Sequence, residues 1–181
     1  MTRRQAVAGI TSLLSNSYRE KVLALMAELS ETFGVPTHGW PHVSYHIAAI
    51  YDTGLAPALQ QLASQTTPFT LRTTGLGLFT GPEPVLYLAL VRNQALTTVH
   101  ERVWAVGEQH GLESVAYYEP AGWVPHITLS HFPADDTRLP DIIAALSRRN
   151  LSWEIPIDNL ALLADAGSGI ALHQQWSLTG V

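Results

Sequence analysis

Two short segments of this chain repeat one pattern of residues that could perform acid–base chemistry. The segments are PHVSYHI at residues 41–47 and PHITLSH at residues 125–131. In each, a histidine is followed two positions later by a hydroxyl residue, which gives the pairs His42–Ser44 and His126–Thr128. Because the ordinary pKa of imidazole is about 6.5, histidine supplies a proton donor and a proton acceptor near neutral pH.

This combination suits an in-line displacement at phosphorus. A neutral imidazole takes the proton of the attacking oxygen, and an imidazolium on the opposite side protonates the leaving oxygen. The hydroxyl groups can donate hydrogen bonds to the non-bridging oxygens, where negative charge accumulates. We therefore take His42 and His126 as candidate catalytic residues and Ser44 and Thr128 as candidate phosphate-binding residues.

Hydrophobic periodicity predicts the elements that must position these residues. Strands are expected over residues 5–13, 41–50, 68–80, 85–92, 125–132, 151–164 and 170–179. Helices are expected over residues 18–33, 55–65, 95–110 and 139–148. Asn16 or Ser17 is a suitable cap for the first helix, and Gly34 should end it.

The two motifs belong to an internal duplication. A shift of 84 residues, from position 42 to position 126, aligns residues of matching class without a gap from residue 41 to residue 78. The first strands begin near residues 5 and 85, an offset of 80 residues. We predict two strand–helix–strand–helix–strand halves, about 1–84 and 85–181, in a single two-lobed domain. The predicted fold is α+β, with antiparallel-rich sheets, helices packed outside, a pseudo-twofold axis and a central groove.

Side chains alternate along a strand, so His42, Ser44 and His46 should share one face. Ser130 takes the place of His46 in the second motif. If a pseudo-twofold axis relates the motifs, their polar faces line one groove from both sides. This arrangement makes His46 a candidate substrate contact.

Aromatic residues in the segment before the second motif offer another contact. Tyr118 and Trp123 lie in a predicted loop, and aromatic side chains can stack on a nucleobase. The alternative is that buried aromatic residues hold this loop in place.

PHVSY and PHITL resemble the two HxTx-type motifs of the two-histidine phosphoesterase superfamily, which includes 2′-5′ RNA ligase-like proteins and cyclic phosphodiesterases. The resemblance extends over nearly the whole chain. It implies a two-lobed α+β fold and metal-independent hydrolysis or transesterification of cyclic (2′,3′-type) or 2′-5′ phosphodiesters. It places the site at His42, Ser44, His126 and Thr128. The chain departs from the family at Ser44, where threonine is commoner, and at Tyr45, where an aliphatic residue is usual.

Composition limits the partners. The chain has 181 residues, a formal net charge of −5 and one lysine, Lys21, which argues against binding to long nucleic acid. A nucleotide or a short RNA end remains a suitable partner, and we expect no cofactor and no metal. No segment approaches the roughly 20 apolar residues of a membrane span, so we expect a cytoplasmic protein. The alternative is a signal peptide at the start of the chain, where Arg3 and Arg4 precede a short apolar run.

Two other functions remain open at this point. One is a metal hydrolase in which His42, His46 and His126 hold zinc, since three imidazoles are a known zinc ligand set. The other is a binding module of the same family that holds a phosphorylated ligand without catalysis.

Overall fold

Strands and helices alternate in the predicted order. The computed structural model describes residues 8–36, 39–133, 135–167 and 169–181. Its helices are α1 (Asn16–Phe33), α2 (Leu55–Ser64), α3 (Gln94–His110) and α4 (Leu139–Leu146), with a 3₁₀ turn at Ala116–Tyr118. Its strands are β1 (Ala8–Leu13), β2 (His42–Ala48), β3 (Ile50–Tyr51), β4 (Phe69–Phe79), β5 (Val85–Leu90), β6 (Gly111–Leu112), β7 (His126–His131), β8 (Glu154–Ile157), β9 (Asn159–Asp165) and β10 (Ile170–Ser177).

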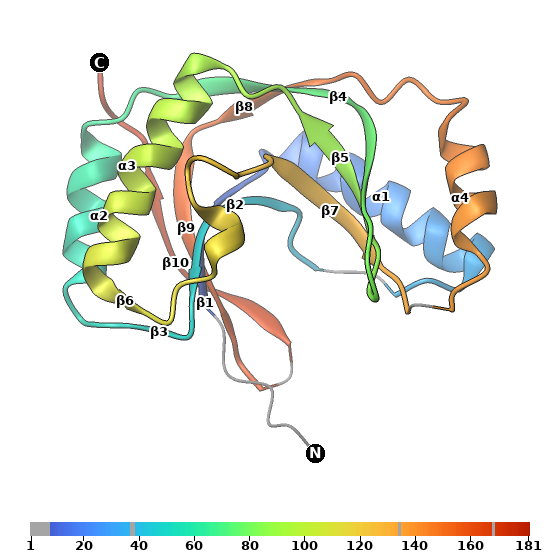
Figure 1. Cartoon of the computed structure of the whole chain (residues 1–181). Coiled ribbons are helices and arrows are strands. Elements are labelled where there is room, and N and C mark those ends of the chain that lie inside the picture. Colours follow the sequence, from blue (N-terminus) through green and yellow to red (C-terminus); the bar gives the residue numbers. More distant parts are fainter. Residues whose placement is uncertain (1–7, 37–38, 134, 168) are drawn as a thin grey trace.

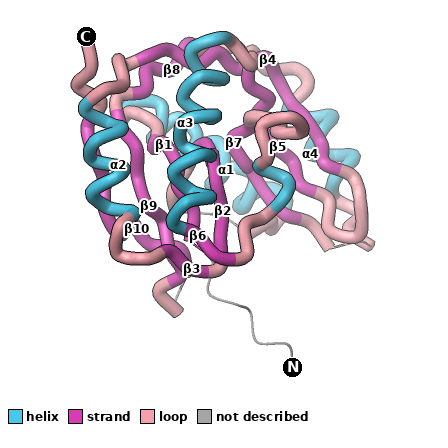
Figure 2. The backbone as a smooth tube through the Cα atoms, turned by 60° about the vertical axis from the view of Figure 1, so that its left-hand side comes forward, coloured by secondary structure: helices cyan, strands magenta, loops and turns pink. Residues whose placement is uncertain are grey.

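Two four-stranded antiparallel sheets form two lobes. The sheet of the first lobe has the order β10-β9-β1-β2, and the sheet of the second lobe has the order β7-β5-β4-β8. Helices α2 and α3 cover the first sheet, and α1 and α4 lie on the second (Figures 1 and 2). Each sheet therefore takes strands from both halves of the chain, so the halves interlock instead of forming one lobe each.

The strand register confirms the internal duplication. In β2, Tyr45 is an extra residue between the cross-strand pairs Ile10–His46 and Thr11–Ser44. In β7, Leu129 is an extra residue between the pairs Leu86–Ser130 and Tyr87–Thr128. The two β-bulges lie at positions related by the 84-residue shift. The strands opposite them are related by a shift of 76 residues, so the expected offset of 80 was wrong.

The pseudo-twofold axis passes between β4 and β8. Leu71 pairs with Ile155, and these residues are equivalent under the 84-residue shift. A pair of equivalent residues that face each other must lie on the axis that relates the halves. In Figure 1 the two strands run across the top of the molecule and join the lobes.

Two details of the predicted elements need correction, and a third is not tested. The strand expected over 151–164 is two strands, β8 and β9, which belong to different sheets and are separated at Asp158. Ser15, and not Asn16 or Ser17, occupies the N-cap position of α1, and its side chain makes no capping hydrogen bond. Residues 5–7 of the first predicted strand lie outside the described residues. The prediction for Gly34 is confirmed, because it ends α1 in the left-handed conformation and its N–H donates to the Ser30 carbonyl.

Within the described ranges, no helix has the length and hydropathy needed to cross a membrane. The helices instead bury one face each against the sheets. In α1 the buried positions are Val22, Leu25, Met26 and Leu29, which follow the spacing of an amphipathic helix.

A buried asparagine joins the end of β1 to the start of β9. Asn159 is 3% exposed. Its Oδ1 accepts a hydrogen bond from the Leu13 N–H at 2.9 Å, and its Nδ2 donates to the Leu13 carbonyl at 2.9 Å. Leu13 is also the cross-strand partner of His42, so this contact supports the strand beside the first motif.

Replacing this asparagine should destabilise the fold. In Asn159→Ala both backbone groups of Leu13 lose their partner in a buried place, which should lower the free energy of unfolding by about 3 kcal/mol. Urea denaturation measures the change, with Asn16→Ala, at an exposed position on α1, as the control. Equal stability of the two variants would contradict the structural role of Asn159.

Candidate active site

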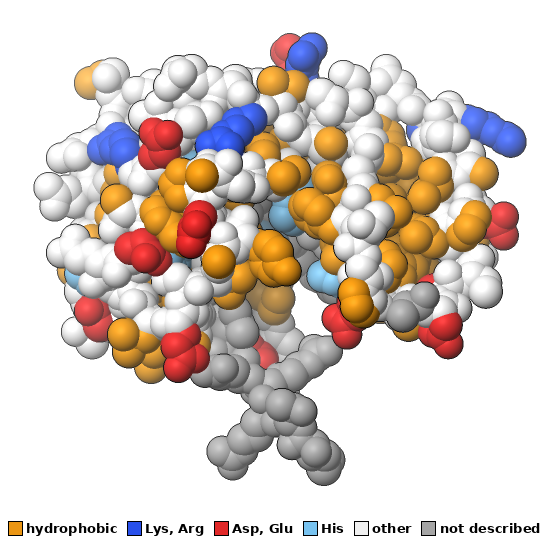
Figure 3. All heavy atoms as spheres, in the orientation of Figure 1, with side chains coloured by type: hydrophobic (Ala, Val, Ile, Leu, Met, Phe, Trp, Pro, Cys, Tyr) orange, Lys and Arg blue, Asp and Glu red, His pale blue; other side chains and the backbone are white. Residues whose placement is uncertain are grey.

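The two motif histidines begin the two edge strands that approach each other across the molecule. His42 is the first residue of β2 and His126 is the first residue of β7. These strands are the edges of the first and second sheets, and they contact each other between the lobes. Figure 3 shows a hollow between the lobes in which histidine side chains are visible. Both His42 and His126 are partly exposed.

The same local contact orients both imidazoles. Nδ1 of His42 lies 2.5 Å from the carbonyl oxygen of Trp40, and Nδ1 of His126 lies 2.8 Å from that of Val124. Because a carbonyl only accepts, Nδ1 carries the proton in each neutral ring and Nε2 is the basic nitrogen. The proline between each carbonyl and its histidine favours an extended conformation in the residue before it. The repeated Pro-His dipeptide thus has a local structural reason.

The two hydroxyl residues lie on the groove side of their strands. Ser44 pairs with Thr11, and Thr128 pairs with Tyr87, in each case before the bulge. Normal alternation therefore places each hydroxyl on the same face as its histidine. Ser44 is 7% exposed, and its side chain forms a hydrogen bond with the Tyr118 hydroxyl.

The prediction that His46 lines the groove was wrong. The bulge at Tyr45 interrupts the alternation, so His46 turns toward α3 and is fully buried. Its Nδ1 lies 2.6 Å from the Tyr51 hydroxyl, and its Nε2 lies 3.1 Å from a carboxylate oxygen of Glu108. The ring packs on Gly107, where a Cβ would come within 2.4 Å of it. Burial lowers the pKa of His46, while the hydrogen bond with Glu108 opposes this shift.

Ser130, the counterpart of His46, is likewise fully buried. It follows the equivalent bulge at Leu129. Only the residues before the bulge, the histidine and the hydroxyl residue, reach the groove from each motif.

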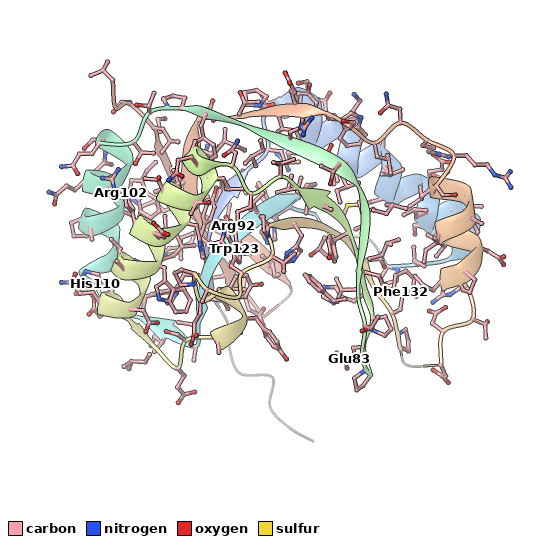
Figure 4. All side chains as sticks on the ribbon, turned by 45° about the horizontal axis from the view of Figure 1, so that its top comes forward. Glu83, Arg92, Arg102, His110, Trp123 and Phe132 are labelled. Carbon is pink, nitrogen blue, oxygen red and sulfur yellow. The ribbon has the colours of Figure 1, made fainter. Side chains whose placement is uncertain are left out.

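Trp123 does not offer a stacking surface, which corrects the second aromatic prediction. Its side chain is 3% exposed, and its Nε1 donates to the Ser44 carbonyl at 3.1 Å. The ring of His100 stacks on it at 3.8 Å between centroids. Arg92 donates to the carbonyl oxygens of Trp123 and Pro120, and Figure 4 shows Arg92 and Trp123 side by side. The alternative, a loop held by buried aromatic residues, is therefore correct for Trp123.

Tyr118 is partly buried beside the groove. Burial raises the pKa of its hydroxyl, and the hydrogen bond with Ser44 opposes that shift. The Tyr118 carbonyl accepts a hydrogen bond from Nε2 of His100 at 2.8 Å. The loop is thus attached to α3 at its backbone and to the candidate phosphate-binding serine at its side chain.

Two groove residues were not found from the sequence. Phe79 meets the ring of His126 edge-on, with 4.9 Å between centroids, and Tyr87 lies 5.2 Å from it. Burial lowers the pKa of His126, with a smaller opposing effect of its hydrogen bond to the Val124 carbonyl. Both aromatic residues lie in LGLF and VLYLAL, segments whose apolar character predicts only buried strands.

The surroundings of His42 are different. Leu13, Ala161 and Leu163 form a small apolar cluster on the groove side of the first sheet, with Trp40 and Leu172 packed against it. The guanidinium group of Arg19 lies 4.4 Å above the Trp40 ring. The two imidazoles therefore share an orientation, but aromatic rings lie against His126, whereas this apolar cluster includes Leu13, the cross-strand partner of His42.

The three imidazoles of the metal-hydrolase alternative are not assembled. His46 is enclosed beneath α3, away from the groove. The part of the chain that the structure describes holds no group of three His, Cys, Asp or Glu side chains with the geometry of a metal site.

A separate cleft of about 480 Å³ lies between α1 and the segment after α4, lined by Lys21, Ala24, Leu25, Glu28, Arg149, Asn150, Leu151 and Trp153. It contains none of the motif residues. Its position gives it no part in the chemistry of the two histidines.

Comparison with known proteins agrees with the fold and with the family resemblance. The family model described as the 2′-5′ RNA ligase superfamily matches residues 20–169. A Bacillus licheniformis protein, provisionally named a phosphoesterase, is 25% identical over 156 residues, which cover 86% of this chain and 84% of that protein.

Two solved structures share the fold. One, described as a phosphoesterase, has a TM-score of 0.68 at 18% identity and covers 97% of this chain and 99% of its own. Escherichia coli LigT in its apo form has a TM-score of 0.65 at 17% identity and covers 96% of this chain and 97% of its own. The chain belongs to the 2′-5′ RNA ligase superfamily. The family resemblance found from the two motifs is therefore confirmed.

Acid should destabilise this site through its buried histidines. Burial lowers the pKa of fully buried His100 from 6.5 to about 4. The unfolded chain therefore takes up the proton first as pH falls. The stability contribution of the neutral ring is complete above pH 6.5 and is lost as pH falls toward 4, by about 1.4 kcal/mol for each unit of pKa shift.

The prediction is that the free energy of unfolding declines between pH 6.5 and pH 4, and that His100→Gln makes this decline shallower. Urea denaturation at a series of pH values measures both. His173→Gln, at an exposed position on β10, is the control and should keep the wild-type slope. If His100→Gln also keeps that slope, His100 does not contribute to the acid sensitivity.

Proposed function

We propose that this chain is a metal-independent phosphodiesterase that acts on a cyclic 2′,3′-type or 2′-5′ phosphodiester of a nucleotide or an RNA end. The single observation that carries the proposal is the matched pair of imidazoles. His42 and His126 begin facing edge strands, and each donates its Nδ1 proton to the carbonyl oxygen two residues earlier. Each ring is thereby fixed with Nε2 as its reactive nitrogen.

His126 is the better general base. Phe79 and Tyr87 pack around its ring, and burial lowers its pKa. The neutral form therefore prevails over a wider pH range than for an exposed imidazole. In hydrolysis, Nε2 of His126 takes a proton from water while the water oxygen forms a bond to phosphorus.

His42 completes the reaction as general acid. Its imidazolium gives a proton from Nε2 to the leaving oxygen as the bond between that oxygen and phosphorus breaks. The products are a phosphomonoester and a free hydroxyl, and a proton exchange with solvent restores both histidines. The hydroxyl groups of Ser44 and Thr128 donate to the non-bridging oxygens and stabilise their charge in the transition state.

The ligands of a structural relative support a small nucleotide substrate. Escherichia coli LigT has been solved in complex with 3′-AMP, ATP, phosphate and NADP+. A phosphate group is common to these ligands. The net charge of −5 of this chain also favours a small substrate over a long polyanion.

The first test replaces the histidines one at a time. His42→Ala and His126→Ala should each lower kcat by on the order of 10²–10⁴, because each variant lacks one proton-transfer group. The double variant should be little worse than either single variant, because the residues act as a unit.

The assay uses 2′,3′-cyclic mononucleotides, cyclic-phosphate-ended RNA and 2′-5′ dinucleotides, with product identification and with chelator present in a parallel series. His173→Gln is the control and should keep wild-type activity. Wild-type activity in either alanine variant would exclude the mechanism. Binding of these nucleotides without turnover would identify a non-catalytic binding module, and loss of activity in chelator would identify a metal hydrolase.

The second test is the dependence of kcat/KM on pH. Since the base must be neutral and the acid protonated, the profile should be a bell. Its acid limb should lie below pH 6.5, the ordinary pKa of histidine, because burial lowers the pKa of His126. His126→Ala should lose the acid limb, and His42→Ala should lose the alkaline limb. A wild-type profile that is flat from about pH 5 to 9 would be incompatible with histidine catalysis.

A further inference from the structure

The duplication provides an internal comparison for the groove wall beside His126. Under the shifts that align the strand pairs, Gly77 corresponds to Ala161, Tyr87 to Thr11, and Phe79 to Leu163. The pair Gly77–Tyr87 in the second lobe thus occupies the place of the pair Ala161–Thr11 in the first. The first lobe forms the same strand ladder without a ring at any of these positions, so the fold itself does not require aromatic residues there.

The lack of a side chain at Gly77 leaves room for the ring of Tyr87. Tyr87 lies across β4 so closely that a Cβ at Gly77 would come within 2.2 Å of its ring. The equivalent position in the first lobe carries a methyl group, that of Ala161. Gly77 and Tyr87 therefore differ from their counterparts together, and their combined effect is to place a ring on the groove side of the second sheet.

Phe79 packs against Tyr87, and the two rings form a continuous aromatic surface. Its centroid lies 4.3 Å from that of Tyr87, with an interplanar angle of 32°. Phe79 is partly exposed, whereas Tyr87 is 8% exposed. Neither ring is part of the large core cluster, which takes Leu86 and Leu88 from the opposite face of β5. The ring that remains accessible lies directly beside His126, where the phosphorus of a substrate would be held.

We propose that Phe79, supported by Tyr87 over Gly77, is a stacking platform for an aromatic substituent of the phosphodiester, and that the enzyme therefore selects nucleoside phosphodiesters over those that lack a base. This inference rests on the proposed function and adds its specificity. Aromatic side chains stack on any base with little dependence on sequence. The platform thus selects for the presence of a base and not for its identity.

The experiment compares two substrates that differ only in the base. One is adenosine 2′,3′-cyclic phosphate, and the other is methyl riboside 2′,3′-cyclic phosphate, which has the same sugar and cyclic phosphate. Wild-type protein should show a kcat/KM about tenfold higher for the adenosine compound, as expected for one stacked base. Phe79→Leu should lower this preference toward one, because any effect on the His126 imidazole changes the rates on both substrates by the same factor and leaves their ratio unaffected.

Leucine is the appropriate replacement because Leu163 occupies the equivalent place in the first lobe. It keeps an apolar side chain beside His126. Gly77→Ala is a second variant, in which the Cβ displaces the Tyr87 ring while both rings remain in the protein. It should also reduce the preference. Leu172→Ala, on the first-lobe sheet, is the matched control and should leave the ratio of the two rates unchanged.

The outcomes separate this inference from the proposed function. Equal wild-type rates on both substrates would overturn the platform and leave the phosphodiesterase intact. A loss of equal size on both substrates in Phe79→Leu would show that the rings serve only the His126 imidazole, which would also overturn it. If neither substrate is hydrolysed, the proposed function fails, and binding measured by calorimetry tests the stacking platform. In that case wild-type protein, but not Phe79→Leu, should bind adenosine 2′-phosphate more tightly than methyl riboside 2′-phosphate.

Discussion

One extra residue in each edge strand determines which side chains reach the groove. An uninterrupted β2 would present His42, Ser44 and His46 to the same side, but the bulge at Tyr45 turns both Tyr45 and His46 toward α3. The groove thereby receives one imidazole and one hydroxyl from each lobe. The buried side of the bulge receives a histidine that attaches the strand to Glu108 and Tyr51. Bulges commonly redirect side chains next to active sites, and here the same bulge occurs in both copies.

The duplication gives the two motif imidazoles the same orientation, while aromatic residues surround His126. Acid–base catalysis needs two imidazoles in opposite protonation states, which a perfectly symmetric site would not define. The Pro-His dipeptides give both rings the same tautomer. Phe79 and Tyr87 lie against the ring of His126, whose pKa burial lowers. In the proposed mechanism, the assignment of His126 as the base therefore rests on these neighbouring rings and not on the motifs.

The sequence predicted those parts of the site that depend on local signals and missed those that depend on contacts between strands. Periodicity located most elements, and the repeat located His42 and His126, because these signals depend on neighbouring residues in one strand or helix. The position of His46 depends on the β-bulge between β1 and β2. Side-chain alternation along β2 alone does not reveal that bulge. Tyr87 and Phe79 were inaccessible to the same reasoning, because apolar residues on both faces of a strand predict burial on both. The buried position of Trp123 depends on its hydrogen bond to the Ser44 carbonyl, and these two residues are 79 positions apart in the sequence.

The interlocking of the halves makes each part of the site depend on both. β1 pairs with β9 and β4 pairs with β5, so either half alone would expose a long strand edge, which is prone to pairing with other chains. The supports of the first motif come from the second half, since His100 and Glu108 on α3 and Trp123 in the following loop hold β2. A substitution in α3 should therefore alter the position of Ser44, although the helix lies outside the groove. The groove exists only once the two halves have closed on each other, which couples formation of the site to completion of the fold.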